Sequence, residues 1–234
     1  MSSRSAGSLM GAFTREALAM ARQWTLLGHD LATVVPARGE DVVVLVHGFL
    51  ATAGVLRPLR DALEADAGVT VASFTHAPGI TVAGLAERVA ELVARVEAER
   101  IQLVGHSMGG LAARWFAQEL GGDPRLVQTV SIASPFWGTK RARALPLALG
   151  RELEPGSAML ARIRDGIGRG VPHFAVSGSH DSVVGPPAPL GAARELVAEG
   201  CGHNAVLYDA RVLGSVVERV RLGRRAESPG VRPL

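Results

Sequence analysis

The sequence has one cysteine (Cys201), one lysine (Lys140) and few aromatic residues, which make up 4% of its 234 residues. A single cysteine excludes an internal disulfide and leaves the redox compartment of the chain open. With so few aromatic side chains, the core has to be built from Val, Leu, Ile and Ala. Aliphatic runs of this kind are typical of parallel strands that are covered on both faces.

Long hydrophobic runs are also missing. No segment approaches the ~20 consecutive apolar residues that a membrane-spanning helix needs. The first residues contain no apolar stretch that leads to a small-residue cleavage site. We therefore expect no transmembrane segment and no secretory signal, and we assign the chain to the cytoplasm by default. Peripheral membrane association and export remain the alternatives.

The positive charge comes almost entirely from arginine, and the net charge is +3. Acidic residues alternate with the arginines along most of the chain, which excludes the basic tracts typical of nucleic-acid-binding proteins. The segment 219–225 is locally basic. A solvated helix end explains it, and contact with anionic lipid is the alternative. We expect no nucleic-acid partner, and the sequence indicates no particular oligomeric state.

The length of the chain fits one domain with a full core. Residues 1–12 are rich in Ser and Gly and are expected to be disordered. Residues 13–40 are expected to form a helix and a connection, residues 41–222 the main domain, and residues 223–234 a frayed tail. The helix is predicted from an apolar stripe at helical spacing, made of Phe13, Ala17, Met20, Trp24 and Leu27. We expect this helix to dock on the main domain, with an interfacial or partner-binding helix as the alternative.

From Asp41 onward, aliphatic runs alternate with amphipathic segments. The runs predict strands near 42–46, 69–74, 101–104, 127–132, 173–176 and 195–198. Helical spacing predicts helices near 54–65, 82–99, 108–120 and 205–222. Strands that alternate with helices predict an α/β fold, with a mostly parallel central sheet and helices on both faces.

A predicted strand is joined to a predicted helix by Gly105-His106-Ser107-Met108-Gly109-Gly110. A G-x-S-x-G sequence in that position is typical of a nucleophile elbow. Because the tight turn strains the serine backbone, its neighbours have to be small, as the glycines are. The turn would raise the Ser107 hydroxyl above the carboxyl edge of the sheet, where α/β folds bind ligands. Ser107 is therefore the predicted nucleophile.

A second loop follows the first predicted strand and contains His47-Gly48-Phe49. A carbonyl group attacked by a serine becomes an oxyanion, which needs two fixed N–H donors. We expect these to be the backbone N–H groups of Phe49 and Met108. Gly48 suits the chain path that such a hole requires. His47 is expected to brace the loop rather than to act as a base, because it lies at a strand end.

These two motifs resemble those of the bacterial lipase and esterase branch of the α/β-hydrolase superfamily. The resemblance spans about 41–208, with further similarity at 133–139, 153–157, 177–181 and 202–204. It implies an α/β-hydrolase fold, to which the pattern of residues 140–165 described below would add a small cap segment. It also implies hydrolysis of carboxylic esters, often of acylglycerols, without an organic cofactor. A small-molecule ester or lipid is thus the expected substrate.

The order of catalytic residues in this superfamily is serine, then acid, then histidine. His203 is the expected base, since it follows the last predicted strand at the sheet edge where Ser107 emerges. Asp181 also follows a strand, and it would hold the tautomer of the histidine and stabilise the imidazolium. The residues that compete for these two roles are His173, His180, Asp123, Asp165, Asp209, Glu195 and Glu199.

No cofactor or metal ion is expected. Cys201 lies two residues from His203, but we expect a small buried residue rather than a second nucleophile. No cluster of His, Asp or Glu has the spacing of a metal site. Two other functions remain open: a thioesterase or acyltransferase with the same triad, and a catalytically silent module that binds lipids or other proteins.

The segment 140–165 separates two predicted core strands and mixes apolar residues with arginines. An amphipathic cap over the site would account for this pattern and would present an apolar wall to an acyl chain. Ordinary packing onto the domain is the alternative. The apolar residues concerned are Leu145, Leu147, Leu149, Met159, Leu160 and Ile163.

Overall fold

The computed structural model describes residues 3–36, 38–191 and 193–225. Its strands form one sheet in the order β2-β1-β3-β4-β5-β6, and every neighbouring pair is parallel. This confirms the predicted α/β fold. The strands are β1 (Gly39–Val46), β2 (Thr70–Ser73), β3 (Ala98–His106), β4 (Leu126–Ile132), β5 (His173–Gly178) and β6 (Arg194–Ala198).

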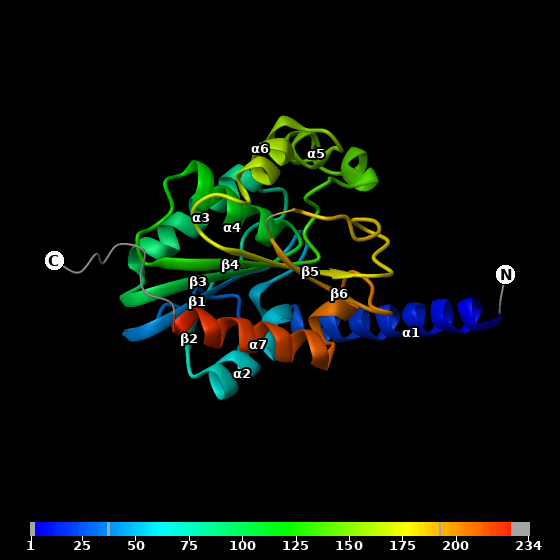
Figure 1. The fold of residues 1–234 in the computed structure, drawn as a ribbon, viewed down its shortest axis with the longest axis horizontal. Helices are drawn as coiled ribbons and strands as arrows, with labels where there is room; N and C mark the ends of the chain where they lie inside the picture. The colour runs from blue at the N-terminus through cyan, green and yellow to red at the C-terminus, as the bar shows by residue number, and fades with distance from the viewer. Residues whose placement is uncertain (1–2, 37, 192, 226–234) are drawn as a thin grey trace.

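Helices cover both faces of the sheet (Figure 1). Along β1, Val42, Val44 and Val46 pack into the core beneath α3 and α4, whereas Val43 and Leu45 pack into the core beneath α2 and α7. This alternation is the two-residue period of a strand that is buried on both faces. The helices are α1 (Ser3–Leu26), α2 (Arg57–Ala62), α3 (Val82–Arg95), α4 (Met108–Glu119), α5 (Leu147–Leu153), α6 (Ala158–Gly166) and α7 (Ala210–Arg224), with short helical turns η1 (Ala53–Leu56), η2 (Leu63–Ala67), η3 (Lys140–Ala144) and η4 (Ala205–Leu207).

The N-terminal segment differs from the expectation in two ways. Helix α1 begins at Ser3, so the prediction of disorder is wrong for residues 3–12, while residues 1–2 lie outside the described part. The helix does contact the domain, but not through the predicted stripe, because Phe13, Met20 and Trp24 are exposed. The helix contacts the domain through its opposite side, which is discussed below.

Two helix boundaries also differ. Helix α3 ends at Arg95 rather than near Glu99, because the chain pairs with β1 from Ala98 onward and sheet pairing prevails over helical spacing. The closing helix is divided into η4 and α7, since the Asp209 side chain accepts the N–H groups of Arg211 and Val212 and starts a new helix there. The predicted tail remains helical up to Arg224, and residues 226–234 lie outside the described part.

The segment 140–165 folds into η3, α5 and most of α6. Its side chains Leu149, Leu153, Leu160 and Ile163 are buried in the core beneath α3 and α4. Helix α6 packs against α4, so these apolar residues follow the ordinary packing alternative. Only Leu147 among the large apolar side chains of the α5 region is strongly exposed. The role of the segment as a cap over the site stays a prediction.

None of the helices in the described ranges is long and apolar enough to cross a bilayer.

Candidate active site

Ser107 lies on a sharp turn between β3, which ends at His106, and α4, which begins at Met108. Its φ of 54° and ψ of −122° are unusual for a residue other than glycine. A backbone of this kind costs about 1–3 kcal/mol and persists only where the surrounding structure holds it. The turn places the serine side chain beyond the carboxyl end of β3, on the edge where α/β folds bind ligands.

The glycines around Ser107 allow three backbone segments to meet. A Cβ at Gly105 would lie under 3.0 Å from the backbone of Gly109, and a Cβ at Gly109 would lie equally close to the Val46 carbonyl. A Cβ at Gly110 would collide with the Ser134 hydroxyl. The expected need for small neighbours therefore has a specific cause, the close approach of α4 to β1, β3 and the loop after β4.

Three side chains from distant parts of the sequence form one hydrogen-bonded chain. Ser107 Oγ lies 3.1 Å from His203 Nε2, and His203 Nδ1 lies 2.8 Å from Asp181 Oδ2. Asp181 follows β5 and His203 follows β6, so all three groups emerge from one edge of the sheet. In this arrangement the serine O–H donates to His203 Nε2, and the N–H at His203 Nδ1 donates to the Asp181 carboxylate.

The carboxylate of Asp181 is held in place on both oxygens. Its Oδ1 accepts the backbone N–H groups of Val183 at 2.8 Å and Val184 at 2.9 Å. Burial raises the pKa of Asp181, but the hydrogen bond and charge of His203, together with these two N–H groups, hold that pKa below its ordinary value. The group is thus a buried carboxylate at neutral pH, suited to orienting a histidine and stabilising its charged form.

The loop after β1 is braced by two stacked histidines. His47 Nδ1–H donates to the Gly48 carbonyl at 2.8 Å, and His47 Nε2 accepts the backbone N–H of His76 at 3.1 Å. The two rings stack 3.9 Å apart. Burial, with a smaller contribution from His76, lowers the pKa of His47 to about 3, so its ring is neutral and matches both hydrogen bonds. The hydrogen bonds of His47 run to Gly48 and His76.

Gly48 brings this loop against the nucleophile, since a Cβ there would lie 2.9 Å from the Ser107 Cβ. The next residue is Phe49, and Met108 begins α4, where backbone N–H groups have no partner within the helix. Neither of these two N–H groups donates to another protein atom within the described ranges.

The family of the chain follows from a sequence comparison. Residues 37–159 match the family described as "Putative serine esterase (DUF676)". The chain belongs to this family. It is a serine ester hydrolase, and the matched residues include the loop after β1 and the whole elbow. No curated protein sequence matches it significantly.

Several solved structures are similar in fold to this serine esterase. One is described as that of LipS and LipT, two metagenome-derived lipolytic enzymes, with 18% identity, a TM-score of 0.60 and coverage of 84% of this chain and 98% of the other. Another is a bacterial membrane phospholipase A, a virulence factor, with 18% identity, a TM-score of 0.56 and coverage of 95% and 96%. A third is the Bacillus licheniformis lipase BlEst2, with 12% identity, a TM-score of 0.59 and coverage of 81% and 95%. At these identities the likeness establishes the fold alone.

Five of the competing residues form hydrogen bonds or ion pairs with other partners in this serine esterase. His173 is buried and pairs with the hydroxyls of Thr129 at 2.8 Å and Ser131 at 3.0 Å. His180 pairs with Ser179. Glu195 accepts the Leu190 N–H, Asp209 caps α7, and Asp123 pairs with Arg125.

Cys201 is buried, as predicted for a small packed residue. Burial, followed by the nearby carboxylate of Asp209, raises the pKa of its thiol to about 11. The thiol is therefore protonated at neutral pH and is a poor nucleophile. Within the described ranges, no group of three His, Cys, Asp or Glu side chains could hold a metal ion.

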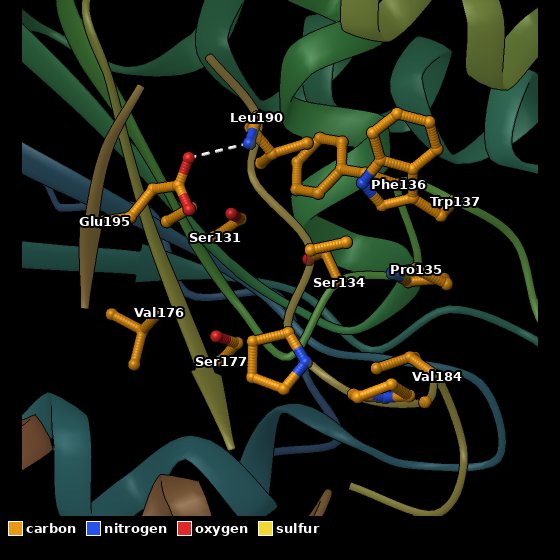
Figure 2. A pocket seen from close by; sticks show the side chains of 15 residues that line it. Ser131, Ser134, Pro135, Phe136, Trp137, Val176, Ser177, Val184, Leu190 and Glu195 are labelled. Carbon is orange, nitrogen blue, oxygen red and sulfur yellow. Dashed lines mark hydrogen bonds between the residues drawn. The ribbon is translucent and has the colours of Figure 1, made fainter. Parts of the chain in front are cut away.

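A pocket adjoins the elbow on the side of β4 and β5 (Figure 2). Its walls include Phe136, Trp137 and Leu190, and Ser134 also lines it. Two contacts tie this pocket to the site: Ser134 abuts Gly110 of the elbow, and Val184 donates its N–H to Asp181. It is an apolar hollow with a few hydroxyl groups beside the hydrogen-bonded chain.

Two residues that support the site were missed by the sequence analysis. His76 follows β2 at the same sheet edge as the other site residues. Its position directly after a predicted strand could have indicated a supporting role. Glu16 lies on α1, nearly 190 residues before the loop it contacts, and nothing in the sequence pattern pointed to it.

Proposed function

We propose that this serine esterase cleaves carboxylic esters of lipids, with Ser107 as nucleophile, His203 as general base and Asp181 as the group that orients the histidine. The observation that carries the proposal is the continuous path from Oγ of Ser107 through the imidazole to the buried carboxylate, with distances of 3.1 and 2.8 Å. Hydrogen-bonded contacts of this length are what proton transfer from a serine requires.

In the first half of the reaction, Ser107 Oγ forms a bond to the ester carbonyl carbon while His203 Nε2 takes the hydroxyl proton. The carbonyl oxygen becomes negative and is held by the N–H groups of Phe49 and Met108. The positive end of the α4 dipole, at Met108, adds to this stabilisation. The bond between the carbon and the alcohol oxygen then breaks, and His203 returns its proton to the departing alcohol.

In the second half, a water molecule gives a proton to His203 Nε2 and attacks the acyl group bound to Ser107. The same two N–H groups hold the second oxyanion. When the bond to Oγ breaks, His203 returns the proton to the serine and the free carboxylic acid leaves. Asp181 keeps its negative charge throughout and stabilises the imidazolium at each stage.

The pocket beside the elbow favours a substrate with a lipid acyl chain, because its walls are apolar. They include Phe136, Trp137 and Leu190. Ligand pockets combine such walls with a few fixed polar groups. No charged side chain of the pocket other than Glu195 is available to bind a polar acyl group, and Glu195 is engaged with Leu190.

The test is to compare Ser107→Ala with the unaltered enzyme on p-nitrophenyl esters of increasing chain length. Loss of the nucleophile is expected to lower turnover by about 10⁶ and to abolish labelling by a fluorophosphonate probe. His203→Ala should behave alike, whereas His180→Ala is a matched control that removes a nearby histidine outside the chain. Hydrolysis that survives in Ser107→Ala with a normal melting temperature would rule out the mechanism.

A further inference from the structure

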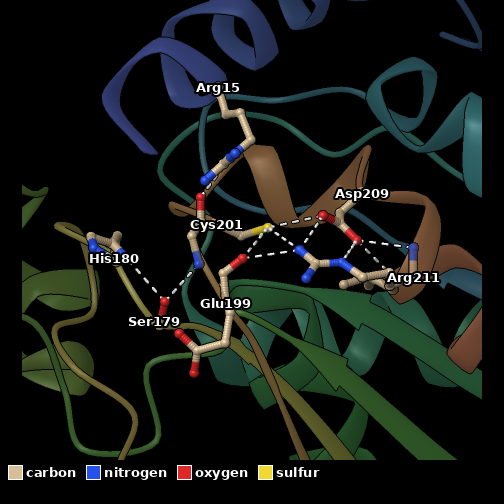
Figure 3. A network of polar contacts seen from close by, with 9 residues as sticks. Arg15, Ser179, His180, Glu199, Cys201, Asp209 and Arg211 are labelled. Atoms are coloured by element: carbon tan, nitrogen blue, oxygen red, sulfur yellow. Dashed lines mark hydrogen bonds and ion pairs between the residues drawn. The ribbon is translucent and has the colours of Figure 1, made fainter. Parts of the chain in front are cut away.

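Helix α1 packs against the domain with its charged side, whereas an ordinary surface helix packs with its apolar side. Its charged side faces the protein: Arg15 Nε donates to the Gly200 carbonyl at 2.8 Å, and the guanidinium of Arg22 lies 4.8 Å from the centre of the Tyr208 ring. Figure 3 shows Arg15 reaching down to the loop that carries Cys201. Among residues 9–26 of α1, the part whose side-chain burial is described, only Ala12 and Ala19 are buried.

The other side of α1 is apolar and exposed. Its large side chains have exposed fractions between 49% and 75%. At 100° per residue five of them fall within an arc of about 100°, which Arg15, Glu16 and Arg22 all lie outside. The exposed Leu18 also lies outside this arc. The residues of this outer face are Leu9, Met10, Phe13, Met20 and Trp24.

We propose that the outer face of α1 binds a lipid surface. A helix that lies on a membrane has such an uncharged face, rich in Trp, Phe and Leu, with basic residues on the remaining surface. Trp and Phe suit the boundary between acyl chains and headgroups. The whole chain carries a net charge of +3, which favours an anionic membrane. Figure 1 shows its first turns extending beyond the rest of the molecule, where a membrane can reach them.

The size of the outer face favours a lipid surface over a second copy of the chain. Stable protein–protein interfaces take about 20–30 residues from each partner, whereas this face offers five. A few aromatic and aliphatic side chains are sufficient for reversible insertion at a lipid boundary. The face also lies on the helix that contacts the His203 loop, so a bound membrane would be close to the site.

The experiment measures flotation with vesicles of equal parts phosphatidylglycerol and phosphatidylcholine. All proteins carry Ser107→Ala, so that binding is measured without turnover and does not depend on the proposed function. The double variant Phe13→Asp/Trp24→Asp is expected to lower the bound fraction about ten-fold or more. Leu120→Asp, which places the same charge on an exposed leucine elsewhere, should bind as the parent does. Because these side chains are exposed, the melting temperatures should match.

Three results would overturn the proposal. The parent protein could fail to float with the vesicles, or the double variant could float equally well. Alternatively, size-exclusion chromatography with light scattering could show a dimer that the double variant loses, and a second copy would then cover the outer face.

The charged side of α1 carries a second inference, which rests on the proposed role of His203. The carboxylate of Glu16 accepts the backbone N–H groups of Asn204 at 3.0 Å and Ala205 at 2.9 Å, and the Asn204 side-chain amide at 2.7 Å. These residues directly follow His203. We infer that Glu16 is a positioning residue, which fixes the loop so that the imidazole stays within reach of Ser107.

The test compares Glu16→Ala and Glu16→Gln on a soluble ester well below the melting temperature. Glu16→Ala is expected to lower kcat about ten-fold or more with little change in KM, because a shift of about 1 Å at a reacting group can reduce the rate up to a hundred-fold. Glu16→Gln retains one acceptor oxygen and should recover part of kcat. Glu64→Ala, in the exposed part of η2, is the matched control.

A lower melting temperature with an unchanged kcat in Glu16→Ala would reduce Glu16 to a structural contact and overturn this inference. The parallel measurement on His203→Ala separates the two proposals. If that variant retains full activity, the proposed mechanism fails. If it is inactive while Glu16→Ala has normal kcat, only the role of Glu16 fails.

Discussion

His106 Nε2 lies 3.1 Å from the carbonyl oxygen of His203, and the two rings lie 5.0 Å apart. Burial, followed by the proximity of His203, lowers the pKa of His106 to about 3. The ring is therefore neutral, and its Nε2–H donates to that carbonyl. The residue before the nucleophile thus holds the backbone of the proposed base, which joins the elbow to the His203 loop.

Replacing this donor should reduce catalysis. His106→Phe keeps a ring of similar size but removes the N–H, and a lost hydrogen bond of this type costs about 0.5–1.5 kcal/mol. If that cost appears in the transition state, kcat falls up to about ten-fold while KM changes little. Steady-state kinetics on a soluble ester, together with a melting curve, measures the effect. An unchanged kcat would show that the contact does not position His203.

The buried histidines should make the enzyme sensitive to acid. Burial, with a contribution from Arg114, lowers the pKa of His173 to about 3, against about 6.5 in the unfolded chain. Between these values the unfolded state binds the proton and the folded state does not. The free energy of unfolding therefore falls as the pH is lowered from about 6.5 towards 3, by up to about 1.4 kcal/mol per pH unit for each such histidine.

This pH dependence can be attributed to a residue by substitution. His173→Gln retains groups that can pair with Thr129 and Ser131 but has no basic nitrogen. Urea unfolding measured at several pH values in this window should give a shallower slope for the variant, by up to about 1.4 kcal/mol per pH unit. Equal slopes in the two proteins would contradict the assignment.

The elbow should tolerate no side chain at Gly105. A Cβ there meets backbone atoms of Gly109 and Gly110, which cannot move aside as the end of a side chain could. Gly105→Ala is expected to lower stability by more than about 3 kcal/mol or to prevent folding, as overpacking of backbone against backbone does. Gly214→Ala in α7 is the matched control, because its Cβ meets nothing within 4 Å. There the helix should gain about 0.5–1 kcal/mol.

Equal stability of the two glycine variants, measured by urea or thermal unfolding, would contradict this account of the elbow.

The parts of the site with a local sequence signature were predicted from the sequence. The elbow around Ser107 depends on a strand, a turn and a helix that are adjacent in the chain, so small residues at fixed spacing reveal it. Asp181 and His203 can be predicted as partners of Ser107 because each follows a strand of a parallel sheet. The carboxyl ends of such strands lie at the same edge of the sheet. In both cases topology limited the number of candidates.

The contact of α1 had no such signature. Hydrophobic spacing predicts that the apolar side of a helix is buried, and here hydrogen bonds of Arg15 and Glu16 with the backbone of a distant loop decide its orientation. The end of α3 was missed for a related reason, since pairing of Ala98 with Gly39 depends on a segment about 60 residues away. The hydrophobic pattern within one segment does not show which distant segment it will contact.

The proposed oxyanion contacts involve the main chain at Phe49 and Met108, so the reaction places no demand on the identity of those two side chains. Phe49 is only partly buried and follows the residue that approaches the serine most closely. Directed evolution could therefore vary position 49 to change which esters are accepted, while the reaction steps at Ser107 stay the same. Among relatives, we likewise expect the side chain at this position to vary while the path of the backbone stays the same.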